Sequence, residues 1–233
     1  MPAVLTPPKT VMILAGLLTV SLFDAASAGR INTSGICERQ FASAAKRHGV
    51  PVAVLAAVGL TETGRGDGLR PYALNINGKA IYDLSRNEAM QEFYAARKRG
   101  IKLIDVGCMQ INHHYHKRHF RSVAEMLEPA KNVDYAARFL KRLYNREKNW
   151  TRAVARYHAS ERNKPAQKRY ICAVIGKLVA AKLGGWTAEA AKFCGVGQAS
   201  GKSLRRSTAA DPAVLMRNEW MAEVNRGDKN VSR

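Results

Sequence analysis

The sequence predicts a mainly α-helical domain, with a signal segment before it and a flexible tail after it. Apolar residues recur at helical spacing through much of the chain, whereas few segments show the alternation of a strand. Residues 64–82 are rich in Gly, Pro and Asn and predict a loop with a short β excursion around 73–81. The expected helices cover residues 36–48, 52–61, 85–99, a long stretch that begins at Pro129, 150–157 and 164–182.

The N-terminal segment has the pattern of a cleaved signal peptide. Lys9 is followed by an apolar run that continues to Phe23, and Ala26-Ser27-Ala28 supplies small residues at the spacing that signal peptidase needs. We therefore expect residues 1–28 to be removed after Ala28 and the protein to reach the periplasm. The run is too short to span a bilayer comfortably, so no stable membrane span is expected.

The formal net charge of +20 favours a polyanionic partner. Nucleic acid is one polyanion, but the chain has no zinc-finger spacing and no RNP-like aromatic motif. A secreted bacterial protein instead meets the cell wall, whose stem peptides and muramyl lactyl groups are anionic. The charge therefore indicates a cell-wall partner and no nucleic acid.

The chain has four cysteines, and an oxidising compartment allows three ways of pairing them. Cys108 lies in an apolar segment, where a buried free thiol and a bridge fit equally well. There is no C-x-x-C pair, which argues against a zinc ribbon. His113, His116 and His119 could share one helical face, but there is no H-E-x-x-H and basic residues crowd the run, so packed or solvated histidines fit better than zinc. We expect no metal and no cofactor.

Glu62 stands at the end of a helix that is apolar nearly all round. Such a helix is buried, and burial together with the negative end of the helix dipole would raise the pKa of this carboxyl. A carboxyl that keeps its proton near neutral pH is what glycosidic cleavage requires of its general acid. From the local pattern alone, an exposed Glu in the last helical turn is the better interpretation.

Three segments in order give Glu62 a context. They are Glu62-Thr63-Gly64, then the run from Gly107 to Asn112, then Ala155-Arg156-Tyr157-His158-Ala159. Together they resemble the lytic transglycosylase family, the goose-lysozyme-like catalytic domain of soluble transglycosylases. The resemblance implies a lysozyme-like fold over residues 34–194, with a glycan-binding cleft for peptidoglycan. Within the family, the three segments resemble most those of specialised transglycosylases that serve flagella or secretion systems.

The resemblance also implies a role for individual residues. Glu62 matches the catalytic acid/base, and the matching substrate-binding positions are Thr63, Met109, Gln110, Tyr157 and His158. The chain departs from the family pattern, with Cys108 for Leu, His158 for Asn and Ser160 for Gly. Many secretion-system relatives have a cysteine near the start of the long helix. Ala130 occupies that region here, which implies that Cys37 finds another partner or stays free.

The reaction type depends on a second carboxylate. A transglycosylase of the resembled family needs one carboxyl to cleave the MurNAc–GlcNAc β-1,4 bond with a 1,6-anhydromuramyl product, which would serve local wall opening. A hydrolytic muramidase generally uses two. The candidates for a second carboxylate are Asp83, Glu88 and Asp105, each of which fits a structural or surface role better, with Asp105 the one to test. An inactive envelope scaffold is the third possibility.

The C-terminal region changes composition after Cys194. Residues 195–210 are rich in Gly, Ser and basic residues and predict a flexible linker. Asp211 and Pro212 then open a short amphipathic run that extends to Val224. Residues 195–233 are therefore expected to dock on a protein partner in a flagellar or secretion apparatus, unless they pack on their own domain or stay disordered.

Overall fold

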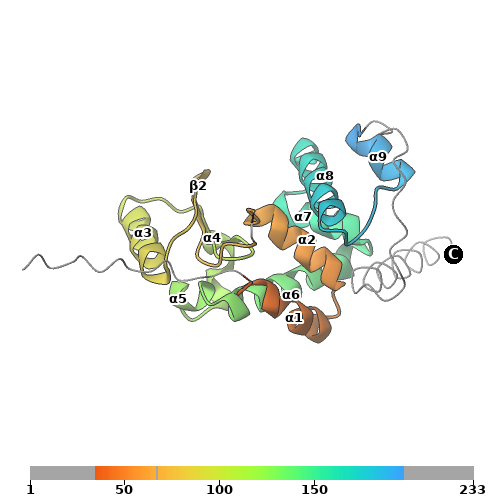
Figure 1. The fold of residues 1–233 in the computed structure, drawn as a ribbon. Coiled ribbons are helices and arrows are strands. Elements are labelled where there is room, and N and C mark those ends of the chain that lie inside the picture. The colour runs from red at the N-terminus through yellow and green to blue at the C-terminus, as the bar shows by residue number, and fades with distance from the viewer. Residues whose placement is uncertain (1–34, 67, 197–233) are drawn as a thin grey trace, which may run out of the picture. The chain divides into compact units, whose positions relative to one another are not determined.

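The structure is a computed structural model that describes residues 35–66 and 68–196 (Figure 1). The predicted signal peptide 1–28 and residues 197–233 of the predicted tail lie outside the described residues. The helices of the described part are η1 (Glu38–Gln40), α1 (Phe41–His48), α2 (Val52–Glu62), α3 (Arg86–Lys98), α4 (His113–His116), η2 (Lys117–His119), α5 (Val123–Met126), α6 (Pro129–Glu147), α7 (Trp150–His158), α8 (Lys164–Ala180) and α9 (Ala188–Cys194). The prediction of a mainly α-helical class is confirmed.

The ends of the long helices follow local sequence signals. Ser85 caps α3 in a reciprocal arrangement, in which its hydroxyl accepts from the backbone N–H of Glu88 and the Glu88 carboxylate accepts from the backbone N–H of Ser85. Pro129 occupies the first turn of α6, where a missing N–H costs nothing. These signals explain why both helices begin within one residue of their predicted starts.

A small antiparallel sheet lies between the helices. Its strands are β1 (Leu74–Ile76), β2 (Lys79–Ile81), β3 (Ile104–Val106) and β4 (Ile111–Asn112), in the order β2-β1-β3-β4. The β excursion predicted around residues 73–81 is confirmed as the β1–β2 hairpin. The sequence did not predict β3 and β4, since segments of two or three residues are too short to show alternation.

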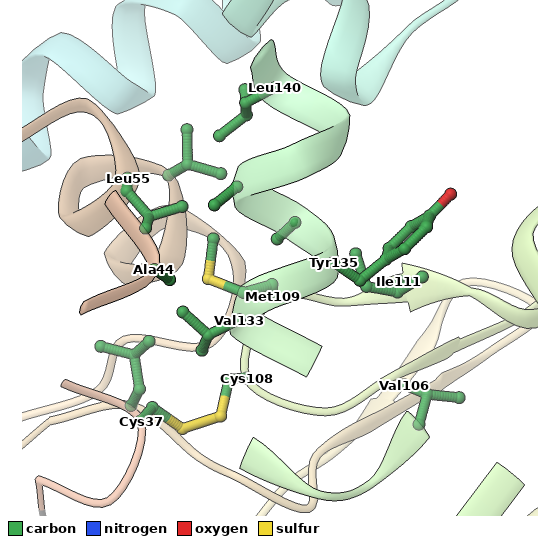
Figure 2. Close-up of a cluster of buried hydrophobic side chains, with 14 of the residues drawn as sticks. Cys37, Ala44, Leu55, Val106, Cys108, Met109, Ile111, Val133, Tyr135 and Leu140 are labelled. Carbon is green, nitrogen blue, oxygen red and sulfur yellow. A yellow bond between two sulfur atoms is a disulfide. The ribbon is translucent and has the colours of Figure 1, made fainter. Parts of the chain in front are cut away.

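The core forms where α2 and α6 meet the turn after β3. α2 packs against α1 and α8, while α6 packs against α1 and α7. Leu55 of α2 and Val133 and Leu140 of α6 face Met109 across this core (Figure 2). A Cβ on Gly59 would lie 2.8 Å from the Leu69 side chain and 2.9 Å from the Phe41 ring. The bare backbone at Gly59 therefore lets α2 lie close to its neighbours.

Two disulfides cross-link the domain. Cys37 bonds to Cys108, and Cys172 bonds to Cys194. The possibilities that Cys108 is a free thiol and that Cys37 stays free are therefore corrected. Both of these cysteines are fully buried, and their bridge ties the start of the domain to the turn after β3 (Figure 2). Within residues 35–66 and 68–196, no helix combines the length and the apolar composition needed to cross a membrane.

Candidate active site

Glu62 is the last residue of α2 and is half-buried. The hydroxyl of Tyr170, from α8, donates a hydrogen bond to Glu62 Oε1 at 2.5 Å. Tyr170 is itself 6% exposed, so the bond forms where the packed faces of α2 and α8 exclude most water. The carboxyl is thus held in one orientation at the end of a rigid helix.

The surroundings of Glu62 raise its pKa from 4.5 to about 8. Burial is the largest cause, because it disfavours the charged form of the carboxyl. The hydrogen bond from Tyr170 opposes this effect, and the nearby charge of Asp105 adds to it. Glu62 therefore carries a proton near neutral pH, as a general acid must.

His158 supports the tyrosine that bonds to Glu62. Its ring stacks on the ring of Tyr170, with centroids 4.3 Å apart and planes 2° from parallel. Burial, together with the charge of Arg169, lowers the pKa of His158, so a neutral imidazole lies on the tyrosine face. Within the described residues, the ring contact of His158 is with Tyr170.

The turn Gly107–Gln110, which joins β3 to β4, lies next to Glu62 and is held by side chains from α6, from α7 and from the end of α2. Asn132 of α6 accepts from the backbone N–H of Met109 at 2.8 Å and donates to the carbonyl of Val106 at 2.9 Å. A Cβ on Gly107 would lie 2.7 Å from the Asn132 amide nitrogen, and its φ is +79°. Only glycine fits this position without strain.

Thr63 and Tyr157 also form hydrogen bonds with the turn. The Thr63 hydroxyl donates to the carbonyl of Cys108 at 2.7 Å, and the Tyr157 hydroxyl donates to the carbonyl of Met109 at 2.8 Å. Thr63 is 1% exposed and Met109 is fully buried. The structure thus places Thr63 and Met109 in the protein interior, which differs from the substrate contacts that the resemblance implied for them.

Gln110 closes the same turn from within. Its side-chain amide donates to the carbonyls of Ala73 and Gly107, and its backbone φ is 45°. A non-glycine residue in this region costs about 1 kcal/mol, so its surroundings must fix it. The amide oxygen of Gln110 keeps no partner among residues 35–66 and 68–196, which leaves it able to accept a hydrogen bond.

The three candidate second carboxylates lie in different surroundings. Asp83 forms an ion pair with Arg70 at the surface, and Glu88 caps α3. Asp105 of β3 accepts from the Asn112 amide at 2.7 Å, and burial raises its pKa. Among these three, Asp105 alone acts on Glu62 as a neighbouring charge.

The three histidines considered as zinc ligands do not all pack at one place. The His113 ring meets the Phe93 ring edge-to-face, whereas His116 and His119 lie against Tyr135. In the part of the chain that the structure describes, no group of three or more His, Cys, Asp or Glu side chains could hold a metal ion.

The comparisons with known proteins bear on this geometry. A family model described as the transglycosylase SLT domain matches residues 39–173, more than half of the 233-residue chain. The chain belongs to this family. Its members are lytic transglycosylases, enzymes that act on peptidoglycan, and the chain is accordingly one of them. Neither the curated proteins nor the solved structures gave a match.

Two residues at the site of this lytic transglycosylase were missed as site residues in the sequence. Tyr170 was visible only as a member of an apolar helical stripe, and Asn132 as an ordinary position in the long helix. Both are polar residues on otherwise apolar faces, and a buried hydroxyl or amide needs a partner. That signal marks them as important but does not identify their partners.

Replacing Glu62 with Gln should stabilise the transglycosylase as pH rises. The native carboxyl keeps its proton up to about pH 8, whereas the unfolded one releases it near 4.5. The wild type therefore loses stability between these values, and the amide does not. The difference in unfolding free energy between the two proteins should reach about 2 kcal/mol at pH 8, allowing for the half-buried position of Glu62.

Thermal unfolding of both proteins from pH 4 to 9 measures this gap. Glu92→Gln, on the exposed face of α3, is the matched control. Parallel melting profiles for wild type and Glu62→Gln would show that the native carboxyl is not held protonated.

Proposed function

We propose that this lytic transglycosylase cleaves the MurNAc–GlcNAc β-1,4 bond and forms a 1,6-anhydromuramyl end, with Glu62 as its one acid and base. The observation that supports this proposal is a half-buried carboxyl whose pKa is raised to about 8 and which Tyr170 holds in place. Such a group can give up its proton at neutral pH and take one back afterwards.

The reaction has two proton transfers. Glu62 first gives its proton to the glycosidic oxygen as the bond from that oxygen to the muramyl C1 breaks. The C6 hydroxyl oxygen of the same sugar then bonds to C1, and its proton passes to the Glu62 carboxylate. The carboxyl ends as it began, and no water enters the product. The intramolecular attack has a high effective molarity, so a second carboxylate is not needed.

Tyr170 is the positioning residue in this scheme. Its hydroxyl donates to Glu62 Oε1 and so stabilises the carboxylate that exists between the two transfers. The stacked ring of His158 restricts the tyrosine to the orientation that makes this bond. Neither residue needs to change its protonation state.

Asp105 supports a hydrolytic alternative. It lies near enough to Glu62 to raise the pKa of that carboxyl, and a second carboxylate could activate a water molecule. Its bond to the Asn112 amide, across the β3–β4 pair, also gives it a structural role. The product of the reaction distinguishes the two mechanisms.

The cellular role is proposed from residues 1–28 and 195–233, of which the structure describes 195 and 196. Residues 1–28 would direct the protein to the periplasm, and residues 195–233 would bind a component of a flagellar or secretion apparatus, so that the wall opens where that machine assembles. The family supports action on the cell wall, and the amphipathic run after Asp211 supports a docking segment.

Digestion of purified peptidoglycan should yield anhydromuramyl ends. Mature wild type, Glu62→Gln and Asp105→Asn are compared by mass spectrometry of the muropeptides. We expect Glu62→Gln to lose activity by about 10³-fold or more, and Asp105→Asn to keep the anhydro product. Reducing ends from the wild type that vanish with Asp105→Asn would instead show a hydrolase, and no cleavage by any protein would favour the scaffold.

Replacing Tyr170 with Phe should shift the pH dependence of cleavage. The hydrogen bond from Tyr170 lowers the pKa of Glu62, so its removal raises that pKa further. Since cleavage needs the protonated acid, the loss of activity at alkaline pH should move to higher pH. The rate at the optimum should fall roughly 10-fold as the carboxyl loses its orientation.

Tyr144→Phe is the control for this experiment, because Tyr144 is half-buried and stacks on Trp150 instead. An alkaline limb of Tyr170→Phe that coincides with that of the wild type would remove Tyr170 from the mechanism.

Deleting residues 197–233 should separate catalysis from docking. This truncation keeps α9 and its Gly195 cap, so peptidoglycan cleavage should remain within about twofold of the full chain. Capture of flagellar or secretion components from envelope extracts should be lost. Capture that persists without the segment would contradict the docking role.

A further inference from the structure

A cluster of arginines lies beside the site and outside the mechanism described above. We call Arg118, Arg138 and Arg142 the arginine patch; all three are exposed. The Arg138 guanidinium lies over the Tyr135 ring at 5.3 Å, and that of Arg142 lies 5.5 Å from both the Tyr135 and Phe139 rings. The rings thus form a floor that supports the charged groups.

The arginine patch has no carboxylate partner within residues 35–66 and 68–196. Other arginines of the domain do, as in the pairs Arg47–Asp134 and Arg156–Glu147. Arg118 contacts a His119 ring nitrogen, and Arg142 donates to the Tyr135 hydroxyl at 3.2 Å. These contacts orient two of the guanidiniums and leave their charge uncompensated.

The positive potential of the patch acts on the histidines beside it. Burial lowers the pKa of His116 to about 4, with help from His119, Arg142 and Arg118. After burial, all three arginines lower the pKa of His119. Arg138 and Arg142 both lie over the Tyr135 ring, against which His119 also packs, so the guanidiniums gather around one place. Such a convergence is a site for anions.

The arginine patch connects to Glu62 through a row of aromatic rings. Phe139 stacks near Tyr135 at 6.3 Å and contacts Tyr157 at 5.5 Å. The Tyr157 hydroxyl bonds to the catalytic turn at Met109, and its pKa, raised chiefly by burial, is raised further by the charge of Glu62. These packed rings connect the arginine patch to the turn beside Glu62.

We propose that the arginine patch binds the carboxylates of the peptides attached to the glycan strand, so that the enzyme prefers peptide-bearing strands to peptide-free ones. This inference rests on the proposed function. Peptidoglycan offers carboxylates along its stem peptides, and a guanidinium pairs with a carboxylate through two parallel hydrogen bonds. Continuity with Glu62 favours this occupant over a free nucleic acid, whose phosphates the patch could also attract.

The test compares two substrates and two triple variants. The substrates are peptide-bearing strands and the same strands after an amidase has removed the peptides. In one variant Arg118, Arg138 and Arg142 are replaced by Gln. In the matched control, Gln replaces Lys98, Arg99 and Lys102, three exposed basic residues outside the patch. The patch variant should lose roughly 10-fold in kcat/KM on peptide-bearing strands and nothing on peptide-free strands, while the control keeps both activities.

Different outcomes refute different claims. Wild type that cleaves neither substrate would refute the proposed function. Wild type that cleaves both equally well, or a patch variant that loses both activities equally, would overturn the inference about peptides. A binding test compares Glu62→Gln with and without the three arginine replacements. If the replacements abolish binding to a labelled oligonucleotide but leave sedimentation with sacculi unchanged, the inference about peptides is overturned.

Arg142 also bonds to Tyr135, so its replacement could unfold the domain. The double variant Arg118→Gln/Arg138→Gln leaves that bond intact, and its melting temperature shows whether the domain is folded. Replacing all three arginines with Lys keeps the charge and should restore part of the preference, because a lysine does not form the two parallel hydrogen bonds of a guanidinium. An unchanged preference in the folded double variant would overturn the proposal.

Discussion

The hydrogen bonding of one short turn holds the site together. The turn Gly107–Gln110 has few neighbours along its own chain that could pair its backbone, so Asn132, Thr63 and Tyr157 supply the partners. A buried backbone group left unpaired costs about 1–3 kcal/mol, so each of these bonds is needed where it stands. Since the donors and acceptors come from α6, α7 and the residue that follows α2, the turn fixes how these helices meet. Glu62, next to Thr63, takes its position from that arrangement.

This arrangement changes how the motif residues are understood. Met109 and Thr63 belong to the short segments that resemble the family, yet both side chains are buried and contact protein. Packing and hydrogen bonding in the interior around Glu62 therefore restrict which residues can stand at these two positions. Glu62 itself lies where burial raises its pKa, at a cost in folding free energy near neutral pH. The interactions around the turn offset that cost and keep a protonated carboxyl at the end of α2.

The sequence predicted the parts of this fold that local patterns encode. The apolar helix before Glu62 and the proline start of α6 appear almost where expected, because spacing and caps specify them. The bond from Tyr170 to Glu62 joins residues 108 positions apart, and no local pattern specifies such a pair. The same holds for the bridge from Cys37 to Cys108, where four cysteines left three pairings open. Three-dimensional packing decided these contacts.

The Cys37–Cys108 bridge also has a topological consequence. It closes a covalent ring of chain that contains α1, α2 and the Glu62 carboxyl. The loop after Glu62 is part of this ring, and its residues Arg65 and Gly66 are exposed. A protease that cuts there would open the ring without releasing a fragment, because each side of the cut still holds one end of the bridge. An enzyme nicked at this loop would remain a single molecule, with its acid still attached to the turn that positions it.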